Sequence, residues 1–516
     1  MGSLGFWRLA AERPDWIAVI DPDGTEHAAG DLLARANQLV HALRERGLRP
    51  GDGIATLMPN GTGALEVYLA ALQAGWYFTP INWHDTPQEI AYIVRDSGAK
   101  AFFADGRFAA QAAAAADEAQ LPAAARFSHG EVPGFLPVTR LRSGQAESMP
   151  ADRTAGAAMH YTSGTTGRPK GVRRPLPPLD PDDAGELMTV LLQMFGGTRG
   201  QPNAHLVTSP NYHTAVTQFG GAALHMGHTL VYMDRWDAAE TLAKVERYRV
   251  TSSHMVPTQF KRMLALPADV RARYDLSSMN WLLHAAAPCP VPVKHAMLEW
   301  WGPCVYEYYA ATEGGGTIAT PQDWLAHPGT VGKPWPISEV RVVAEDGHDC
   351  GPGVPGTIYM KMAVSEFVYK DDPAKTAAGR MDGFFTVGDI GFFDEDGFLY
   401  LCDRKSDMII SGGTNIYPAE IEAELTVHPK VADVAVFGIP DDDWGEQIKA
   451  VVQPAEGVAP GPELAAELIA SLEGRLAKIK WPRSMDFIAQ MPRDPNGKLL
   501  KRKLRAPYWE GRSRAI

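Results

Sequence analysis

The chain has 516 residues, of which 45% are hydrophobic and 21% are charged, a composition typical of a globular protein with more than one core. Its formal charge of −12, from 49 Lys plus Arg against 61 Asp plus Glu, argues against a dedicated nucleic-acid binder, whose footprint is basic. The four cysteines form no CxxC pair, which argues against a zinc ribbon or a disulfide framework and favours a reducing compartment. The sequence has no signal-peptide pattern and no apolar run long enough to span a bilayer, so we expect a cytoplasmic protein without a transmembrane segment.

Helices and strands alternate in the first part of the chain. Apolar spacing and capping residues predict helices over residues 32–43, 64–74 and 87–97, and strands over residues 53–58 and 101–104. This alternation predicts α/β layers with mainly parallel strands. The alanine-rich residues 109–121, which end before Pro122, predict a surface helix.

The texture changes between Gly347 and Gly397, where a Gly/Pro turn cluster is followed by short strands, such as residues 357–361 and 398–402. This pattern predicts a β-rich subdomain that closes the large unit. Beyond Asp403 the sequence predicts a helix over residues 419–427 and strands over residues 431–439 and 448–453. About 110 residues remain there, enough for a small domain with its boundary near residues 404–406.

Hydroxyl residues, glycines and one lysine gather at residues 161–172, in the order Tyr-Thr-Ser-Gly-Thr-Thr-Gly-Arg-Pro-Lys-Gly-Val. Glycines let backbone N–H groups approach a phosphate, hydroxyls add donors, and a lysine adds charge. The spacing differs from a Walker loop, because Lys170 follows Gly167 by three residues and precedes Gly171. A generic run of this composition indicates a flexible polar surface loop, but this ordered string favours a phosphate site. The candidate phosphate-binding residues are Thr162, Ser163, Gly164, Thr165, Thr166, Gly167 and Lys170.

This string resembles the phosphate loop of the acyl-adenylate-forming superfamily, which includes acyl-CoA synthetases, adenylation domains of peptide synthetases and firefly-type luciferases. The other motifs of the superfamily follow in order over nearly the whole chain. Residues 308–313, Tyr-Tyr-Ala-Ala-Thr-Glu, are similar to its adenine and magnesium segment, with Ala310 in place of the usual glycine. The resemblance implies that Tyr309 stacks on adenine, that Thr312 contacts the α-phosphate and that Glu313 binds Mg²⁺. An aromatic face suits a base, and a carboxylate suits a hard cation.

Two later motifs resemble the ribose and catalytic segments. Residues 386–389, Thr-Val-Gly-Asp, imply that Asp389 accepts both ribose hydroxyls, as one ionised carboxylate can. Arg404 resembles the second ribose contact, and Lys498 resembles the catalytic lysine that bridges the carboxylate and the α-phosphate, where a positive charge offsets two negative groups. Taken alone, Arg404 would belong to a surface ion pair and Lys498 to an exposed turn. We expect a solvated face from the basic residues that follow, Lys501, Arg502, Lys503 and Arg505.

Residues 210–214, Pro-Asn-Tyr-His-Thr, match the segment that lies beside the acyl pocket in the family. The match implies that His213 lies near the reacting carboxyl and lines the passage for pantetheine. Amino-acid-activating relatives carry an Asp near here, but no acid stands between Ser209 and Phe219, so we expect an uncharged acyl chain. The predicted pocket wall consists of His213, Thr217, Phe219, Gly220, His284, Ala285, Ala286, Gly314 and Gly315. Most of these side chains are small and leave room for a medium- or long-chain fatty, alicyclic or steroid side-chain acid, although many relatives have a small residue at the position of His284.

Residues 411–420 resemble the strand that relatives bring to the site for thioester formation. Gly412 and Gly413 would let the pantetheine arm pass against bare backbone, and a β-bulge or tight turn is the alternative. Ser406 aligns with the hinge residue, usually Asp or Lys in relatives, and a hinge needs only to absorb a change in φ and ψ. The implied fold is a large α/β domain over residues 1–405, built of layered subdomains with a β-rich closing subdomain, and a small mobile α+β lid over residues 406–516.

The resemblance implies an ATP-dependent, AMP-forming acid–thiol ligase, an acyl-CoA synthetase. Such an enzyme forms acyl-AMP from a small-molecule carboxylic acid, releases pyrophosphate and passes the acyl group to coenzyme A. ATP, Mg²⁺ and coenzyme A would be its cofactors and co-substrates. The alternatives are a ligase that loads a carrier protein, a luciferase-like adenylate oxygenase, and a non-catalytic nucleotide-binding protein. The exact acid and a homodimeric state are left open.

Overall fold

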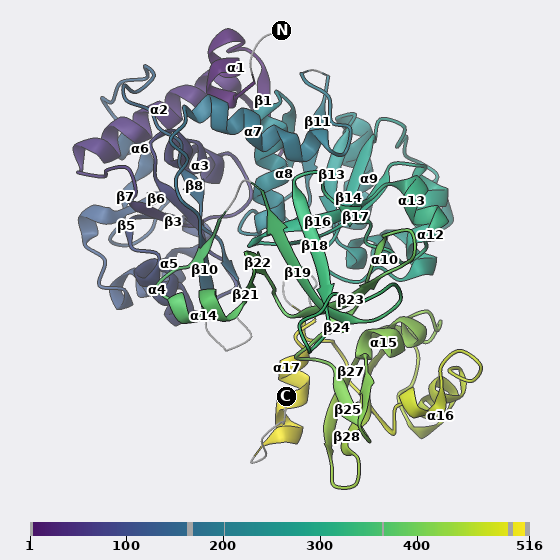
Figure 1. The fold of residues 1–516 in the computed structure, drawn as a ribbon. Helices are drawn as coiled ribbons and strands as arrows, with labels where there is room; N and C mark the ends of the chain where they lie inside the picture. The colour runs from purple at the N-terminus through teal and green to yellow at the C-terminus, as the bar shows by residue number, and fades with distance from the viewer. Residues whose placement is uncertain (1–3, 163–168, 201, 364–365, 494–498, 511–516) are drawn as a thin grey trace. The chain divides into compact units, whose positions relative to one another are not determined.

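The computed structural model of the protein describes residues 4–162, 169–200, 202–363, 366–493 and 499–510 (Figure 1). The chain divides into two compact units. The first unit comprises Met1–Met255, Ala265–Leu283 and Val364–Ala378, and the second comprises Val256–Leu264, His284–Ala363 and Gly379–Ile516. The predicted boundary between residues 405 and 406 lies inside the second unit and stays a prediction.

A parallel sheet in the first unit has the strand order β7-β6-β5-β3-β4-β8. Its strands are β3 (Gly53–Leu57), β4 (Tyr77–Pro80), β5 (Ala99–Asp105), β6 (Arg126–His129), β7 (Leu136–Pro137) and β8 (Ala157–Ala158). The helices of this stretch are α2 (Ala29–Glu45), α3 (Thr62–Gln73), α4 (Pro87–Asp96), α5 (Ala109–Glu118) and α6 (Val138–Arg142). Helix α4 begins in a capping box, in which Thr86 accepts from the Glu89 N–H and Glu89 accepts from the Thr86 N–H. The predicted α/β layers are therefore confirmed.

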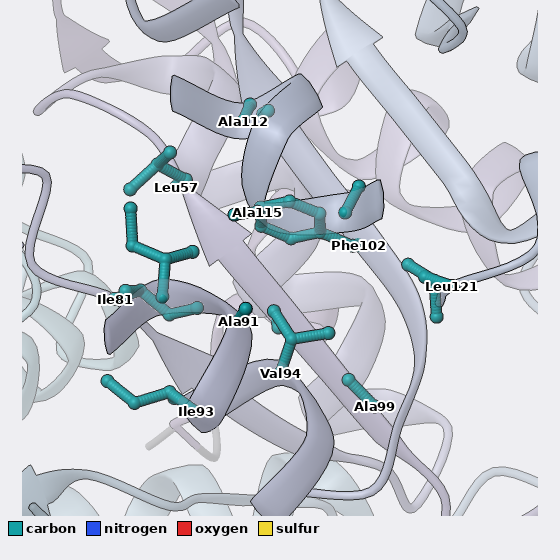
Figure 2. Close-up of a cluster of buried hydrophobic side chains, with 14 of the residues drawn as sticks. Leu57, Ile81, Ala91, Ile93, Val94, Ala99, Phe102, Ala112, Ala115 and Leu121 are labelled. Atoms are coloured by element: carbon teal, nitrogen blue, oxygen red, sulfur yellow. The ribbon is translucent and has the colours of Figure 1, made fainter. Parts of the chain in front are cut away.

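Helices α4 and α5 pack on strand β5 through a core of buried side chains (Figure 2). Val94 on α4 and Phe102 on β5 belong to this core. The helix predicted over residues 109–121 forms but ends earlier, at Glu118, and it packs by one face: Ala112 and Ala115 are fully buried, whereas Ala110 and Ala114 are exposed. Residues three apart share one face of a helix, and alanine on that face lets the helix lie close to its neighbours.

A second sheet in the first unit contains the parallel neighbours β13-β11-β12-β1, with β2 antiparallel to β1. Its strands are β1 (Ile17–Ile20), β2 (Glu26–Ala28), β11 (Ala204–Val207), β12 (Thr229–Tyr232) and β13 (Ser252–Met255), and β14 (Trp281–His284) follows in the chain. A small antiparallel sheet consists of β9 (Tyr161–Thr162), β10 (Lys170–Arg173) and β20 (Val368–Tyr369). The helices of this region are α1 (Phe6–Glu12), α7 (Pro181–Gln193), α8 (Thr214–His225), α9 (Ala238–Arg247), α11 (Ala268–Arg271) and α14 (Pro373–Ala378).

The second unit begins with α10 (Pro257–Leu264), α12 (Val291–Trp301) and α13 (Pro321–Ala326) and an antiparallel ribbon of β15 (Val305–Ala311), β16 (Gly314–Ala319) and β17 (Lys333–Pro334). An antiparallel sheet follows, made of β18 (Ser338–Val343), β19 (Gly356–Met362), β21 (Arg380–Met381), β22 (Phe384–Phe385), β23 (Asp389–Phe393) and β24 (Leu399–Arg404). This sheet is the predicted β-rich subdomain. The sequence signalled it because turn clusters separate short apolar strands.

The C-terminal part of the second unit has its own core. Its strands are β25 (Ile409–Ser411), β26 (Thr414–Ile416), β27 (Val431–Asp441), β28 (Gly445–Pro454) and β29 (Ser484–Phe487), and its helices are α15 (Pro418–Thr426), α16 (Pro462–Ala470) and α17 (Lys501–Arg505). Ile421 and Leu425 on α15 and Leu468 on α16 pack with strands β27 and β28 in one buried cluster. The α+β class predicted for this region is confirmed. Among the helices of the described ranges, none is long and apolar enough to cross a bilayer.

The first unit buries several histidines, and they predict a dependence of stability on pH. Burial, helped by the neighbouring His228 and His254, lowers the pKa of His205 to about 3. His205 is therefore neutral in the folded protein at pH 5, whereas it is protonated in the unfolded chain, whose pKa is about 6.5. The stabilising contribution of neutral burial is present above pH 6.5 and is lost as the pH falls from 6.5 towards 3.

We expect His205→Gln to reduce the slope of unfolding free energy against pH, between pH 6 and pH 4.5, by about 1.4 kcal/mol per pH unit. Urea unfolding at several pH values would measure the slope. His348→Gln is the matched control, because the side chain of His348 is 86% exposed. Equal slopes for the two variants would contradict a neutral, buried His205.

Candidate active site

The ends of the predicted phosphate loop are fixed by neighbouring strands. Lys170 on β10 pairs with Thr162 on β9 in antiparallel register, and the hydroxyl of Tyr161 donates to Asp96 at 2.6 Å. The Lys170 amine forms an ion pair with Asp372 and lies 5.9 Å from the ring centroid of Tyr369. The loop residues Ser163, Gly164, Thr165, Thr166 and Gly167 lie outside the described residues. The structure therefore brings Thr162 and Lys170 together at the base of the loop.

Three residues predicted to hold the nucleoside meet at one carboxylate. The hydroxyl of Tyr309 on β15 donates to Asp389 Oδ2 at 2.7 Å, and Arg404 Nε lies 3.3 Å from Asp389 Oδ1. Asp389 and Arg404 stand opposite each other on β23 and β24. Burial and the charge of Asp389 raise the pKa of Tyr309 well above its usual value, so the phenol keeps its proton and remains a donor.

Thr312 and Glu313 form the connection between β16 and β15, the strand that contains Tyr309. Thr312 is half-buried and Glu313 is buried. The pairing of β15 with β16 shifts register at Ala310/Ala311, and Gly314 and Gly315 have positive φ values of 122° and 70°. A β-bulge re-aims the side chains next to it, so this local geometry sets the direction of Glu313.

Backbone conformation, rather than pocket room, accounts for glycine at 314 and 315. An L side chain rarely adopts their positive φ, and a Cβ on Gly315 would stand 3.0 Å from Met360 Cβ. A side chain at position 315 would therefore be crowded as well as strained. The roles of Gly314 and Gly315 in the acyl pocket stay predictions.

His213 lies in a buried aromatic and histidine cluster of the first unit. It is the N-cap residue of α8, and its ring centroid is 4.2 Å from that of Tyr212. Burial lowers the pKa of His213 well below its usual value, and the neighbouring His160 and His254 lower it further. His213 is therefore a neutral imidazole at physiological pH, which can accept a proton but carries no charge to hold a carboxylate.

The next turn of α8 supplies the other predicted pocket residues of this unit. The Thr217 hydroxyl donates to the Asn211 carbonyl at 2.6 Å and lies 3.3 Å from His160 Nε2. The Phe219 ring stacks on His254 with centroids 5.5 Å apart, and Gly220 is buried in the same helix. Sequence reasoning missed His160 and His254, because each comes from a strand region far from residues 210–220 in the chain.

His284 belongs to a buried charge network of the second unit. Its side chain is fully buried, its Nε2 lies 2.5 Å from Lys294 Nζ, and Lys294 forms an ion pair with Glu307 at 3.2 Å. The Nε2 edge of its ring is therefore directed at Lys294 and Glu307, and its role in the acyl pocket stays a prediction. Of the small neighbours, Ala285 is buried and Ala286 is exposed, with a φ of 71°.

Gly412 and Gly413 form the two-residue turn between β25 and β26, with φ values of 57° and 77°. Two consecutive positive φ values are typical of a type I′ hairpin turn. A Cβ on Gly412 would stand 2.5 Å from the Trp444 ring, and the Gly412 N–H donates to the Trp444 carbonyl at 2.9 Å. The tight-turn alternative thus describes this backbone, and contact with pantetheine stays a prediction. Lys498 lies outside the described residues.

The comparisons with known proteins cover nearly the whole chain. Residues 6–364 match the AMP-binding enzyme family, and residues 420–498 match the AMP-binding enzyme C-terminal domain. The chain belongs to the AMP-binding enzyme family. It is 34% identical over 515 residues to a feruloyl-CoA synthase of an Amycolatopsis species, with 98% of this chain and 99% of the relative covered.

Two further matches are a relative whose name gives a different acceptor and a solved structure with ATP bound. A fatty acid–[acyl-carrier-protein] ligase, ScoC of Streptomyces coeruleorubidus, is 29% identical and covers 94% of this chain and 92% of its own. The solved structure of ATP-bound MatB from Rhodopseudomonas palustris is 29% identical, with a TM-score of 0.82 over 98% of this chain and 99% of that one. The predicted family and fold class are confirmed, and the protein is an AMP-forming acid–thiol ligase.

The Tyr309 hydroxyl can be tested apart from the aromatic face. We expect Tyr309→Phe to raise the KM for ATP about three- to tenfold, because it removes a hydrogen bond of roughly 1 kcal/mol that orients Asp389. Steady-state kinetics with ATP and with 2′-deoxy-ATP would measure the effect, which should be smaller for the deoxynucleotide. Tyr359→Phe on β19 is the matched control. An unchanged KM in Tyr309→Phe would remove the hydroxyl from nucleoside binding.

Proposed function

We propose that the protein is an acyl-CoA synthetase, which joins a carboxylic acid to AMP and then transfers the acyl group to coenzyme A. The observation that carries the proposal is the meeting of Tyr309 and Arg404 at the Asp389 carboxylate. These residues come from three strands and three sequence motifs. They combine an aromatic face with a carboxylate acceptor and a cation, the groups that an adenosine requires.

Each of the proposed site residues has a separate role in the adenylation step. Thr162 and Lys170 lie at the two ends of the loop that would hold the phosphates, and Thr312 would contact the α-phosphate. Lys498 would place a positive charge between the attacking carboxylate and that phosphate, where negative charge accumulates. Glu313 would hold Mg²⁺: one buried carboxylate is a suitable ligand for an ion that takes its other oxygens from phosphates and water, and the ion would neutralise phosphate charge when bound.

The proposed acid has an uncharged and largely apolar body. The predicted acyl segment of the first unit consists of neutral His213, Phe219 and the aromatic Tyr212, and residues 209–219 contain no acid. An ammonium group on the substrate would find no carboxylate partner in that segment. A medium- or long-chain fatty acid, an alicyclic acid or a steroid side-chain acid fits this description. The names of the relatives add an aryl acid, since the feruloyl-CoA synthase is among them.

Coenzyme A is the proposed acceptor, and a carrier protein is the second candidate. The feruloyl-CoA synthase supports the first, and the carrier-protein ligase ScoC supports the second. His213 would line the thiol passage, and the turn at Gly412 and Gly413 would present bare backbone to pantetheine, which is common to both acceptors. We also propose a cytoplasmic location, since Cys289, Cys304, Cys350 and Cys402 are free thiols in the structure.

The first experiment is an acid panel with the purified protein, ATP, Mg²⁺ and coenzyme A. The panel would run from acetate through long-chain fatty acids to aryl, alicyclic and steroid side-chain acids. We expect AMP and pyrophosphate to appear with one class of bulky apolar acid, together with the acyl-CoA. Pyrophosphate exchange without acyl-CoA would favour the carrier protein, light emission or oxygen uptake would favour the oxygenase, and ADP as product would overturn adenylation.

Lys498→Ala separates the two half-reactions. We expect it to lower acyl-AMP formation by at least about a hundredfold, because an electrostatic group acting on the transition state is lost, and to leave thioester formation from supplied acyl-AMP within about twofold. Rapid quench assays of each step would show this. Lys503→Ala, which removes an exposed lysine nearby, is the control. Equal loss in both steps would contradict the role proposed for Lys498.

A further inference from the structure

The basic residues at the end of the chain do not form one solvated face, contrary to the expectation from the sequence. Lys501 and Arg505 lie four residues apart on α17 and reach the carboxylates of Glu422 and Asp407, with side chains 13% and 18% exposed. Arg502 and Lys503, on the same short helix, are exposed. The four side chains differ in exposure because residues four apart, such as Lys501 and Arg505, share one face of a helix.

Lys501 is held by an acidic cluster. Its amine lies 2.8 Å from the Glu422 carboxylate on α15. Burial alone would lower the pKa of Lys501, but the charges of Glu422, Asp403 and Asp407 outweigh burial and raise it. Lys501 is therefore charged at physiological pH and anchors α17 beside the segment from Asp403 to Asp407.

Arg505 reaches the predicted hinge itself. Its Nη1 donates to the Ser406 carbonyl at 3.1 Å and lies 3.5 Å from Asp407 Oδ1. The guanidinium thus contacts both residues on either side of one peptide bond. Both contacts come from Nη1, whose two N–H groups are fixed in the plane of the guanidinium, so together they restrain the orientation of that peptide.

The backbone around Ser406 is tied down on both sides. The Lys405 N–H donates to the Gly388 carbonyl at 2.8 Å, and the N–H groups of Asp407 and Met408 both donate to the Arg404 carbonyl. Ser406 is exposed, and its side chain has no charge with which to hold a hinge. A rotation about Ser406 would therefore have to break or re-aim the hydrogen bond from Arg505.

We propose that Arg505 is a positioning residue for the hinge: it holds the Ser406–Asp407 peptide and so sets the balance between the two half-reactions. The inference rests on the proposed function and on the mobile lid that the resemblance implies, which would serve adenylation and thioester formation in different orientations. In relatives a charged hinge residue is usual, whereas here the charge comes from α17, about a hundred residues further along the chain.

The contact can be tested without any substrate. Hydrogen exchange with mass spectrometry would follow peptides that span residues 404–410 in the full-length protein. We expect Arg505→Gln to accelerate exchange of the Asp407 and Met408 amides about fivefold, since a partly buried ion pair contributes roughly 1 kcal/mol to local opening. Peptides from the core strands β27 and β28 should exchange as in the wild type.

Arg502→Gln is the matched control, because it removes one positive charge from the exposed face of α17. Unchanged exchange at residues 404–410 in Arg505→Gln, or an equal rise in Arg502→Gln, would overturn the proposal. If Arg505→Gln accelerates exchange throughout the C-terminal part, Arg505→Lys is the variant that tests the contact. That variant keeps the charge but loses the fork, so a rise confined to the hinge supports the proposal and no rise overturns it.

A second experiment measures the two half-reactions with the acid that the substrate panel identifies. We expect Arg505→Gln to change acyl-AMP formation and thioester formation from supplied acyl-AMP by factors that differ at least about threefold, because only the hinge balance shifts. Equal changes would show that Arg505 only stabilises the fold. If hinge exchange responds as expected while the wild type forms no acyl-AMP with any acid, the contact stands and the proposed function fails.

Discussion

The placement of the Asp389 carboxylate depends on hydrogen bonds, because its side chain is only 14% exposed and a buried charge must be compensated. The compensation comes from the Tyr309 hydroxyl on one side and from Arg404 on the other. These bonds connect the ribbon of β15 and β16 to the sheet that contains β23 and β24. The same pairing of β23 with β24 delivers the chain to Asp403, whose carboxylate accepts from the Ala419 N–H at the start of α15. The strand pair that holds the Asp389 carboxylate against Tyr309 and Arg404 therefore also fixes Asp403, from which the chain continues into the C-terminal part.

Short linear motifs allowed much of the candidate site to be predicted. Tyr309, Asp389 and Arg404 each stand in a string whose residue types suit a base, a diol or a linker, and the structure brings the three together. The parallel layers of the first unit were also predictable, because strand and helix periods alternate over short distances. Both the site motifs and the α/β layers could be predicted because each depends on residues close together in the sequence.

Contacts between distant segments could not be predicted in the same way. The pairing of Lys170 with Asp372 spans about 200 residues, and no local pattern marks Asp372 as a partner. The contacts of His284 with Lys294 and Glu307 were not predicted, because only the fold places these two residues against its ring. Alanine suits an exposed helix as well as a tightly packed one, so the sequence of α5 could not distinguish between them.

The turn at Gly412 and Gly413 has a consequence for how this region tolerates change in length. Its two residues with positive φ close the pair Ser411–Thr414 and thereby set Ile409 opposite Ile416, both of which are fully buried. Insertion of one residue would shift β26 by one position and place Asn415 where Ile416 now lies, and deletion of one residue would place Tyr417 there. Substitutions at the exposed Thr414 and Asn415 are therefore tolerable, whereas a side chain at Gly412 and single-residue insertions and deletions are not, and the spacing between Ser411 and Thr414 should stay constant in descendants of this chain.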